Sequence, residues 1–384
     1  MSELDSQPEQ SLLTIGELVV DWIATTKGAS WSGPDTFLRS AGGNAANVAT
    51  AYARLGGKTR LVAKVGSDIH GRYLLETLSD SGIDTRFVFE TSRYPTAQCY
   101  VLTSEDEENI FFNWPKPNAC HQLTVKELSP DMFEGSYALH ATGISLTVEP
   151  RSHFVIAAMR RARELGLLIS FDAGFPYGEG ELARKLTKEA MSLSHLLKVN
   201  LPELIYWLGR SKHEVAVSEL AANPTKEKHL EILLTYSRDF LNQTGAEVVL
   251  CTLGAFGSIV VNAESEKFYP PYKVKSLAGV GAGDAYVAAI LYKLYDNYQK
   301  LLAMPGGPPR QAVLLPAKMQ QELEQNRQNS GKMPGVNFIR PQDILALDWD
   351  EAARFANATG ALATRTISAS SGLPTLAEVQ ALLS

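Results

Sequence analysis

The residues best suited to chemistry stand in the stretch LAGVGAGDAY, residues 277–286, where three glycines precede Asp284. The apolar spacing that follows predicts a helix that begins here. The N–H groups of Gly281, Ala282 and Gly283 would then lie at the helix N-terminus, which favours an anion. A carboxylate beside a bound phosphate could take the proton of an attacking hydroxyl group, as phosphoryl transfer requires. The alternative is that Asp284 only complements the helix dipole.

A second glycine-rich element, SAGGNAANVATAYARLGG at residues 40–57, precedes an amphipathic stretch. Gly42 and Gly43 would let a ligand approach the backbone closely, and the amides of Asn44 and Asn47 can donate to and accept from hydroxyl groups. The alternative is a tight turn capped by asparagine.

Two nucleotide-binding motifs are excluded by spacing. GGKT at residues 56–59 has Tyr52 where a P-loop needs its first glycine, and it precedes a strand, so we interpret it as a turn. The loop at residues 279–284 lacks the last glycine of GxGxxG, because Asp284 and Tyr286 stand at the positions where that glycine would fall.

Around these loops, apolar strand candidates alternate with amphipathic helix candidates, which predicts a mostly parallel sheet with helices on both faces. The run at residues 11–20 predicts one buried strand that ends at Asp21. The strand and helix pairs that follow are 59–66 and 71–82, 137–143 and 149–166, 167–174 and 180–194, and 195–200 and 201–209.

Other segments break this alternation. Residues 22–41 and 94–119 alternate over short runs, which predicts antiparallel hairpins that form a small lid. Residues 304–342, rich in Pro, Gly, Gln and Asn, predict a poorly packed connection to a helix at 348–365. Residues 1–10 are expected to be a disordered tail, since they are acidic where a signal peptide would be basic and apolar.

Composition narrows the class of partner. The 384 residues carry a net charge of −6 without a basic stripe, so we expect a small-molecule partner and neither nucleic acid nor membrane. The longest apolar stretch, residues 248–261, is short of the roughly 20 residues that span a bilayer. A cytoplasmic protein is therefore expected. Cys99, Cys120 and Cys251 form no CxxC motif and are expected to be reduced.

The combination of residues 42–85 with residues 279–291 resembles the two signatures of the phosphofructokinase-B (PfkB), or ribokinase-like, carbohydrate kinase family. The likeness extends from about residue 12 to the C-terminus, except for residues 304–342. It implies a ribokinase-like three-layer α/β/α domain over residues 11–384 with a small β lid. It also implies ATP and Mg²⁺ as cofactors and a sugar as substrate, and the chain is most similar to fructokinases and 2-keto-3-deoxygluconate kinases.

The resemblance also implies roles for individual residues. Asp284 would be the general base, and residues 281–283 would form the anion hole. Sugar contacts would come from Asp21, Gly42, Gly43, Asn47 and Glu149, nucleotide contacts from Thr252, Gly254, Gly257 and Asn357, and Mg²⁺ contacts through water from Asn200 and Glu203. Two alternatives stay open. Asn200 and Glu203 could be a helix cap and a first-turn acid, and Glu149 could simply precede a helix that starts at Pro150.

The chain departs from the family pattern at several positions. Ala278 replaces an aspartate that the family commonly uses for an activating monovalent cation, so we expect weak or absent activation by potassium. Gly174 and Pro176 replace the Asn and Arg of a DPNxR motif. Fructokinases often carry an arginine in the lid before a turn that contains proline, and here Lys116 only stands next to that position. These departures favour an alternative function, a catalytically impaired sugar sensor or assembly component. The resemblance also allows for a homodimer formed through the lid.

Overall fold

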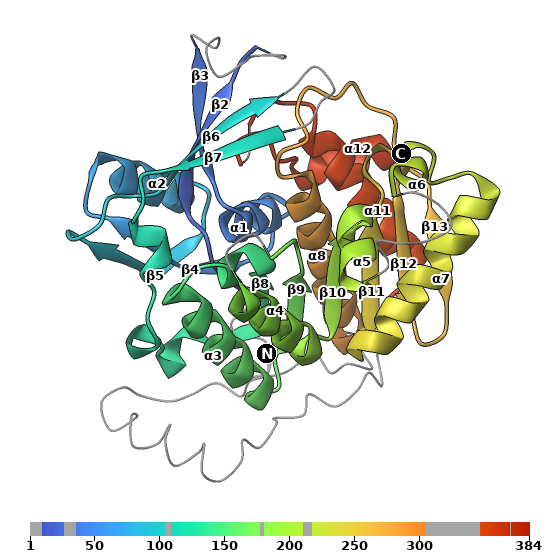
Figure 1. Ribbon diagram of the computed structural model, residues 1–384, viewed down its shortest axis with the longest axis horizontal. Coiled ribbons are helices and arrows are strands. Elements are labelled where there is room, and N and C mark those ends of the chain that lie inside the picture. The colour runs from blue at the N-terminus through green and yellow to red at the C-terminus, as the bar shows by residue number, and fades with distance from the viewer. Residues whose placement is uncertain are drawn as a thin grey trace.

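A nine-stranded sheet forms the centre of the described part of the chain, in the order β13-β12-β11-β10-β9-β8-β1-β4-β5 (Figure 1). The computed structural model describes residues 10–26, 36–103, 109–176, 180–209, 217–303, 346–368 and 370–384. Strand β12 is antiparallel to both neighbours, and the other neighbouring pairs are parallel. The strands are β1 Ser11–Ile15, β4 Thr59–Gly66, β5 Asp84–Thr91, β8 Ser136–Thr142, β9 Leu168–Asp172, β10 Leu196–Asn200, β11 Val248–Thr252, β12 Ser258–Asn262 and β13 Glu266–Tyr269.

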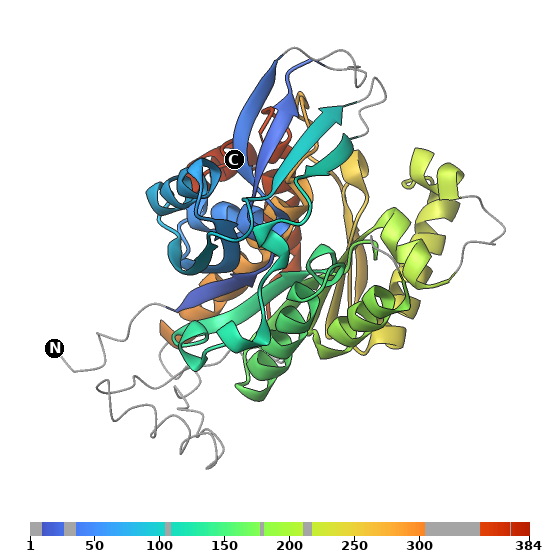
Figure 2. The ribbon, with the colours of Figure 1, turned by 60° about the vertical axis from the view of Figure 1, so that its left-hand side comes forward.

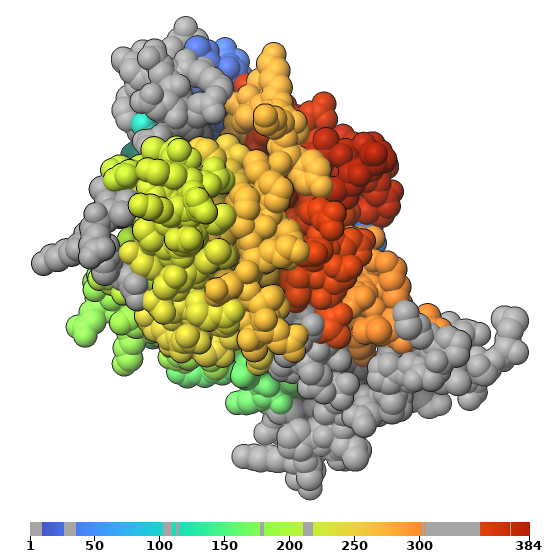
Figure 3. Space-filling view, turned by 90° about the vertical axis from the view of Figure 1, so that its right-hand side faces the viewer, coloured from blue at the N-terminus to red at the C-terminus, as the bar shows by residue number. Residues whose placement is uncertain are grey.

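Helices cover both faces of this sheet, as predicted (Figures 1 and 2). Because successive side chains of a strand point to opposite faces, Leu12 belongs to the core under α1, α8 and α11, while Leu13 belongs to the core under α3, α4, α5 and α7. The helices are α1 Asn44–Arg54, α2 Ile69–Asp80, α3 Arg151–Glu164, α4 Glu181–Leu193, α5 Leu201–Trp207, α6 Val217–Ala222, α7 Glu227–Thr244, α8 Ala282–Ala303, α11 Trp349–Ala363 and α12 Leu376–Leu383. Figure 3 views the side on which α7, the β12–β13 hairpin, α11 and α12 lie beside one another.

A second sheet, in the order β3-β2-β6-β7, is formed by the segments predicted to make a lid, and it projects from one end of the molecule (Figure 2). We refer to it as the lid sheet. Its strands are β2 Val19–Ala24, β3 Phe37–Gly42, β6 Gln98–Thr103 and β7 Asn109–Trp114. Antiparallel pairing of β2 with β3 and of β6 with β7 confirms the predicted hairpin pattern, while β2 and β6 pair in parallel.

The prediction of one strand over residues 11–20 was wrong. Strand β1 ends at Ile15, and the chain turns at Gly16, which has a φ of 153° and no room for a side chain, since a Cβ there would lie 2.3 Å from Ser145 Oγ. The chain then enters the lid as β2. Asp21 is therefore a residue within a lid strand, and it does not end a strand of the large sheet.

The remaining predicted elements are found close to their expected bounds. GGKT forms a turn in which Gly56 has a φ of 99°, and β4 follows from Thr59. The three cysteines are buried and free. The predicted tail, apart from Gln10, and the predicted connection at residues 304–342 lie outside the described residues. Among the described helices, none combines the length and apolar character needed to cross a membrane.

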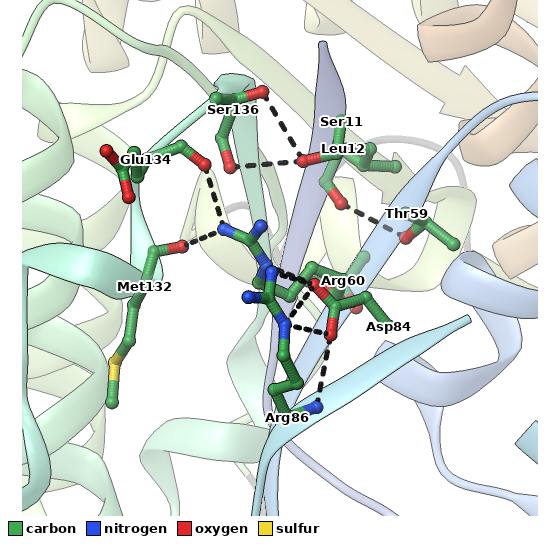
Figure 4. A network of polar contacts seen from close by, with 11 residues as sticks. Ser11, Leu12, Thr59, Arg60, Asp84, Arg86, Met132, Glu134 and Ser136 are labelled. Atoms are coloured by element: carbon green, nitrogen blue, oxygen red, sulfur yellow. Dashed lines mark hydrogen bonds and ion pairs between the residues drawn. The ribbon is translucent and has the colours of Figure 1, made fainter. Parts of the chain in front are cut away.

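A polar network lies where strands β4 and β5 of the large sheet begin (Figure 4). Arg60 in β4 donates from Nε to Asp84 Oδ2 at 2.8 Å, and from Nη1 to the carbonyl groups of Met132 and Glu134, each at 2.9 Å. Arg86 donates from Nη2 to the same Asp84 oxygen at 2.8 Å. These arginines hold the pKa of Asp84 well below its usual range, although partial burial alone would raise it.

Candidate active site

Helix α8 begins directly after the glycine loop, so Asp284 lies in its first turn, as predicted. Gly281, just before the helix, has a φ of 79°, a conformation that residues with side chains rarely adopt. The first N–H groups of a helix have no carbonyl partner within the helix, and Ala282 donates only a long hydrogen bond of 3.4 Å to the Gly279 carbonyl. The N–H group of Ala282 therefore lies at a helix N-terminus with only this weak partner, and helix N-termini in general favour an anion.

Asp284 is buried, and Asn47 in the first turn of α1 donates a hydrogen bond from Nδ2 to Asp284 Oδ2 at 2.9 Å. Burial raises the pKa of Asp284 to about 7, and the hydrogen bond from Asn47 opposes this rise. A carboxyl group with a pKa near neutrality is suited to accept and release a proton. The sequence did not predict this contact of Asn47. Its Oδ1 is buried and has no hydrogen-bond partner among the described residues, so it can still accept from a ligand.

Asp21, from lid strand β2, is a second buried carboxylate close to Asp284. Burial, and then the negative charge of Asp284, raise the pKa of Asp21 to about 7. A Cβ on Gly42 would lie 1.8 Å from Asp21 Oδ2, so only glycine leaves room for this carboxylate. Gly43 has a φ of 98°, and a Cβ there would lie 2.6 Å from the Glu17 carbonyl oxygen. Of the predicted glycine pair, Gly42 thus leaves room for Asp21, and Gly43 lets the backbone pack closely against Glu17.

Glu17 supports this region through a buried ion pair that the sequence analysis missed. Its Oε1 lies 2.9 Å from Nη1 of Arg151, the first residue of α3. Its Oε2 accepts hydrogen bonds from the hydroxyl groups of Thr142 and Ser145, at 3.3 and 3.1 Å. The turn between β1 and β2, which leads to Asp21, is therefore fixed to the carboxyl end of β8. The available signal was a carboxylate within an otherwise apolar run.

Lys198 and Asp172 form a second buried ion pair that was not predicted. They stand opposite each other on β10 and β9, and Lys198 Nζ donates to Asp172 Oδ2 at 2.8 Å. Asp172 Oδ1 is buried without a hydrogen-bond partner in the described chain. Burial alone would lower the pKa of Lys198, but the charges of Asp172 and Glu203 raise it above its ordinary value. Lys198 is therefore a buried cation among carboxylates.

Asn200 and Glu203 form the helix cap that the sequence analysis kept as an alternative. Asn200 Oδ1 accepts from the Glu203 N–H group at 2.9 Å, and Glu203 Oε2 accepts from the Asn200 N–H group at 2.7 Å. This reciprocal pair is a capping box at the start of α5. Burial raises the pKa of Glu203 to about 7, against the charge of Lys198.

The carboxylates beside Lys198 are of the kind that binds Mg²⁺, since proteins hold this ion through one or two carboxylates together with phosphate oxygens and water. Asp172 and Glu203 provide carboxylate oxygens close enough for the charge of one to raise the pKa of the other. The described residues contain no group of three or more His, Cys, Asp or Glu side chains that could hold a metal ion by itself. The donor set therefore fits a Mg²⁺ ion that arrives with phosphate groups and keeps most of its water.

The residues predicted on the nucleotide side lie around the end of β11. Thr252 ends this strand and pairs with Asn200 in β10. Gly254 and Gly257 have φ values of 59° and 104°, and a Cβ on Gly257 would lie 2.2 Å from the Tyr269 carbonyl oxygen. Asn357 in α11 is buried and donates from Nδ2 to the carbonyl groups of Tyr269 and Pro270, each at 3.1 Å. Asn357 thus ties α11 to the segment after β13.

Comparison with known proteins identifies the class of this site. Residues 9–315 match the model described as "pfkB family carbohydrate kinase". The chain belongs to this family. It is therefore a carbohydrate kinase, an enzyme that transfers a phosphoryl group to a sugar, and its two-sheet architecture is the expected ribokinase-like α/β fold.

Fructokinases are among the similar members of the PfkB family. The chain is 28% identical over 375 residues to Fructokinase-1 of Zea mays, with 97% of each chain covered. A crystal structure of the fructokinase of Xylella fastidiosa with bound ATP has a TM-score of 0.69 and 25% identity, with 98% of each chain covered. The fructokinase of Vibrio cholerae O395 with fructose, ADP and calcium ion has the same TM-score and identity, with 98% of this chain and 99% of that chain covered.

Three residues that depart from the PfkB pattern, Ala278, Gly174 and Pro176, belong to the described part of the chain. Ala278 is buried, and its N–H group donates to the Thr364 carbonyl at 3.1 Å. Gly174, after β9, has a φ of 55°, and its carbonyl accepts from Trp207 Nε1 at 2.7 Å. Pro176 follows two residues later and is partly buried.

The remaining predicted residues, Glu149 and Lys116, lie at the surface of the kinase. Glu149 is exposed, and its Oε1 lies 2.6 Å from Nε2 of His153. Helix α3 begins at Arg151, after Pro150. Lys116, beyond the lid strand β7, is also exposed. Neither side chain has a described hydrogen bond or ion pair to Asp21 or Asp284.

Proposed function

We propose that this PfkB kinase transfers the terminal phosphoryl group of ATP to a hydroxymethyl group of fructose, or of a related ketose or keto sugar acid. The observation that carries this proposal is the position of Asp284, buried in the first turn of α8 beside Asn47 and Asp21. One element thus offers both an anion-binding N-terminus and a carboxylate for the hydroxyl group. The likeness to fructokinases supports the choice of sugar.

In the proposed reaction, Asp284 accepts the proton of the sugar hydroxyl group. The hydroxyl oxygen forms a bond to the terminal phosphorus atom, while the bond from that phosphorus to the bridging oxygen breaks. ADP leaves with the electron pair of the broken bond, and Asp284 then releases its proton to water. The N–H groups of Gly281, Ala282 and Gly283 stabilise charge on the phosphoryl oxygens.

The sugar is proposed to bind between the lid and α1. Asp21 would accept hydrogen bonds from sugar hydroxyl groups, and Asn47 would add its unpartnered Oδ1. Gly42 and Gly43 keep side chains out of this space. Glu149 would act only at the rim, since its side chain is exposed. Closure of the lid would exclude water, which otherwise competes for the phosphoryl group.

The nucleotide is proposed to bind over the carboxyl ends of β10 and β11, near Thr252, Gly254 and Gly257, with Asn357 holding the adenine side in place. Mg²⁺ would be held near Asn200 and Glu203 through water. When bound, it would neutralise charge on the phosphate groups. The carboxyl ends of parallel strands are the usual ligand side of such sheets, which supports this placement.

An assay of ADP release over fructose, ribose, 2-keto-3-deoxygluconate and nucleosides tests the proposed reaction. We expect turnover with fructose or the keto sugar acid and much less with the nucleosides. Sugar binding without any release of ADP would contradict the proposal and would favour the alternative, a sugar sensor or assembly component. The fructokinase relatives do not favour that alternative.

A homodimer through the lid is proposed as the assembly. Strand β7 is at the edge of the lid sheet, and its Ile110, Phe111 and Phe112 side chains are exposed. An edge strand with exposed apolar side chains favours pairing with another chain. Sedimentation should show a dimer that Phe111→Glu dissociates. A wild-type protein that sediments as a monomer at all tested concentrations would contradict this assembly.

A further inference from the structure

The ammonium group of Lys198 lies against the first turn of α8. A Cβ placed on Gly283 would lie 3.2 Å from Lys198 Nζ and 3.6 Å from its Cε, so the two residues are neighbours. The lysine comes from β10 and is almost fully buried, with a side-chain exposure of 8%. A buried positive charge therefore adjoins the N–H groups proposed to hold the transferred phosphoryl group.

The charge of Lys198 is favoured by Asp172, Glu203 and Asp284, but its hydrogen-bond donors are not all used within the described chain. A helix N-terminus carries a partial positive charge and repels a cation. Among the described residues, Lys198 donates a hydrogen bond only to Asp172, although an ammonium group has three N–H donors. Burial of the remaining donors is unfavourable unless they find an acceptor. An anionic ligand at the start of α8 would supply one.

We propose that Lys198 is a catalytic residue that donates a hydrogen bond to the phosphoryl group as it moves from ATP to the sugar. This inference rests on the proposed function and adds a point charge to the backbone anion hole. Asp172 holds the ammonium group in place through one N–H, and another N–H turns toward the phosphoryl oxygens. The proton stays on Lys198 throughout. Ammonium groups bind phosphate as point charges, which suits an oxygen whose charge changes during transfer.

The competing explanation is that Lys198 only neutralises Asp172. Removing one partner of a buried ion pair is strongly destabilising, so loss of activity in Lys198→Met alone would not separate the two explanations. The double variant Lys198→Met/Asp172→Asn removes both charges with little change in volume. Thermal unfolding should show that the double variant is more stable than the single variant.

Calorimetric titration with nucleotides provides a readout that does not depend on turnover. We expect Lys198→Met/Asp172→Asn to bind the β,γ-imido analogue of ATP about 10- to 100-fold more weakly than Asp172→Asn, which shares any lost contact to Mg²⁺, because a charge-assisted hydrogen bond is lost. Binding of ADP, which lacks the terminal phosphoryl group, should change less than about threefold. With a sugar substrate, kcat should fall about 10²- to 10³-fold in Lys198→Met and in the double variant.

Two results would overturn the proposal. One is an equal loss of affinity for ADP and for the imido analogue. The other is a double variant whose kcat returns to within about threefold of wild type, since charge balance would then explain the lysine. Failure of the proposed function looks different. In that case wild type would bind the analogue but phosphorylate no sugar, and the comparison of the two nucleotides would still decide the role of Lys198.

Discussion

Two buried cations of the large sheet have different surroundings. One lies where the strands begin, which we call the amino edge, and the other lies toward the side where the parallel strands end, which we call the carboxyl edge. Arg60, at the amino end of β4, meets Asp84 and two backbone carbonyl groups (Figure 4). Lys198, in the middle of β10 and opposite the last residue of β9, donates within the described chain only to Asp172, although Glu203 and Asp284 also lie close enough to affect its pKa.

The pKa values of the carboxyl groups at the two edges are shifted in opposite directions. The pKa of Asp84 is held well below its usual range by its two arginines, against partial burial. Burial raises the pKa values of Asp21, Glu203 and Asp284 to about 7. At the amino edge, the charge of Asp84 is thus paired with arginines of the protein itself, and the cluster stabilises the fold. The carboxyl-edge cluster contains more carboxylates than its cations can satisfy, as expected where ligands and a metal ion complete the charge balance.

The largest expected effect is on turnover at the carboxyl edge. Asp284→Asn keeps an acceptor for Asn47 but removes the base, so kcat should fall at least about 10³-fold while the affinity for sugar stays within about threefold. A coupled assay of ADP release and calorimetry with the sugar measure the two quantities. The matched control is Asp84→Asn, which should keep wild-type kcat. Near-normal turnover of Asp284→Asn would refute the assignment of the base.

The next effect is on stability at the amino edge. Arg60→Met should lower the free energy of unfolding by about 2–4 kcal/mol, because it leaves Asp84 and two carbonyl groups without their main donor. Arg86→Met serves as the control, since its side chain is 71% exposed and donates to the same carboxylate. It should cost less than about 1 kcal/mol. Urea unfolding of both variants measures the difference, and equal costs would show that burial of Arg60 adds nothing.

The pH dependence of stability should differ in sign between the two edges. Asp284 has a raised pKa in the folded protein, so its contribution is present below its unfolded pKa and is lost as the pH rises through about 7. Asp284→Asn should therefore gain thermal stability over wild type as the pH increases from about 5 to about 8. Asp84 has a lowered pKa, so its contribution is present above its unfolded pKa and is lost in acid.

Thermal unfolding of wild type, Asp284→Asn and Asp84→Asn across this range tests the expected signs. Asp84→Asn should be less stable than wild type at neutral pH, with a difference that closes as the pH falls below about 4. A stability difference between Asp284→Asn and wild type that stays constant with pH would contradict the raised pKa of Asp284.

Local patterns predicted most of the elements that form these two edges. The alternation of strands and helices and the start of α8 depend on residues a few positions apart, and they are found as expected. The cap formed by Asn200 and Glu203 is equally local, and it is the alternative that the sequence left open beside a role toward Mg²⁺. The position of Asp21 in the lid sheet was missed because the chain turns at Gly16, where the backbone packs closely against Ser145, a residue distant in the sequence.

The ion pairs were missed for a related reason. Lys198 meets Asp172 because β9 and β10 are neighbours in the register that places these residues opposite each other. Glu17 meets Arg151 because the turn after β1 packs on the start of α3. Strand order and register are set by the whole fold, so a single sequence contains no local signal for either pair. A charged residue within an apolar strand indicates only that some partner must exist.

The smallest expected effect concerns monovalent cations at the carboxyl edge. Ala278 offers a buried methyl group where a carboxylate would attract potassium, and its N–H group is bonded to the Thr364 carbonyl. Replacing a size-matched inert cation with K⁺ at constant ionic strength should therefore change kcat less than about twofold. The variant Ala278→Asp sharpens this test. The added carboxylate should either make kcat depend on potassium or destabilise the loop by burying an unpaired charge. A several-fold activation of wild type by K⁺ would mean that backbone carbonyl groups alone complete a cation site. The charge balance of the carboxyl edge would then depend on a monovalent ion as well as on its substrates.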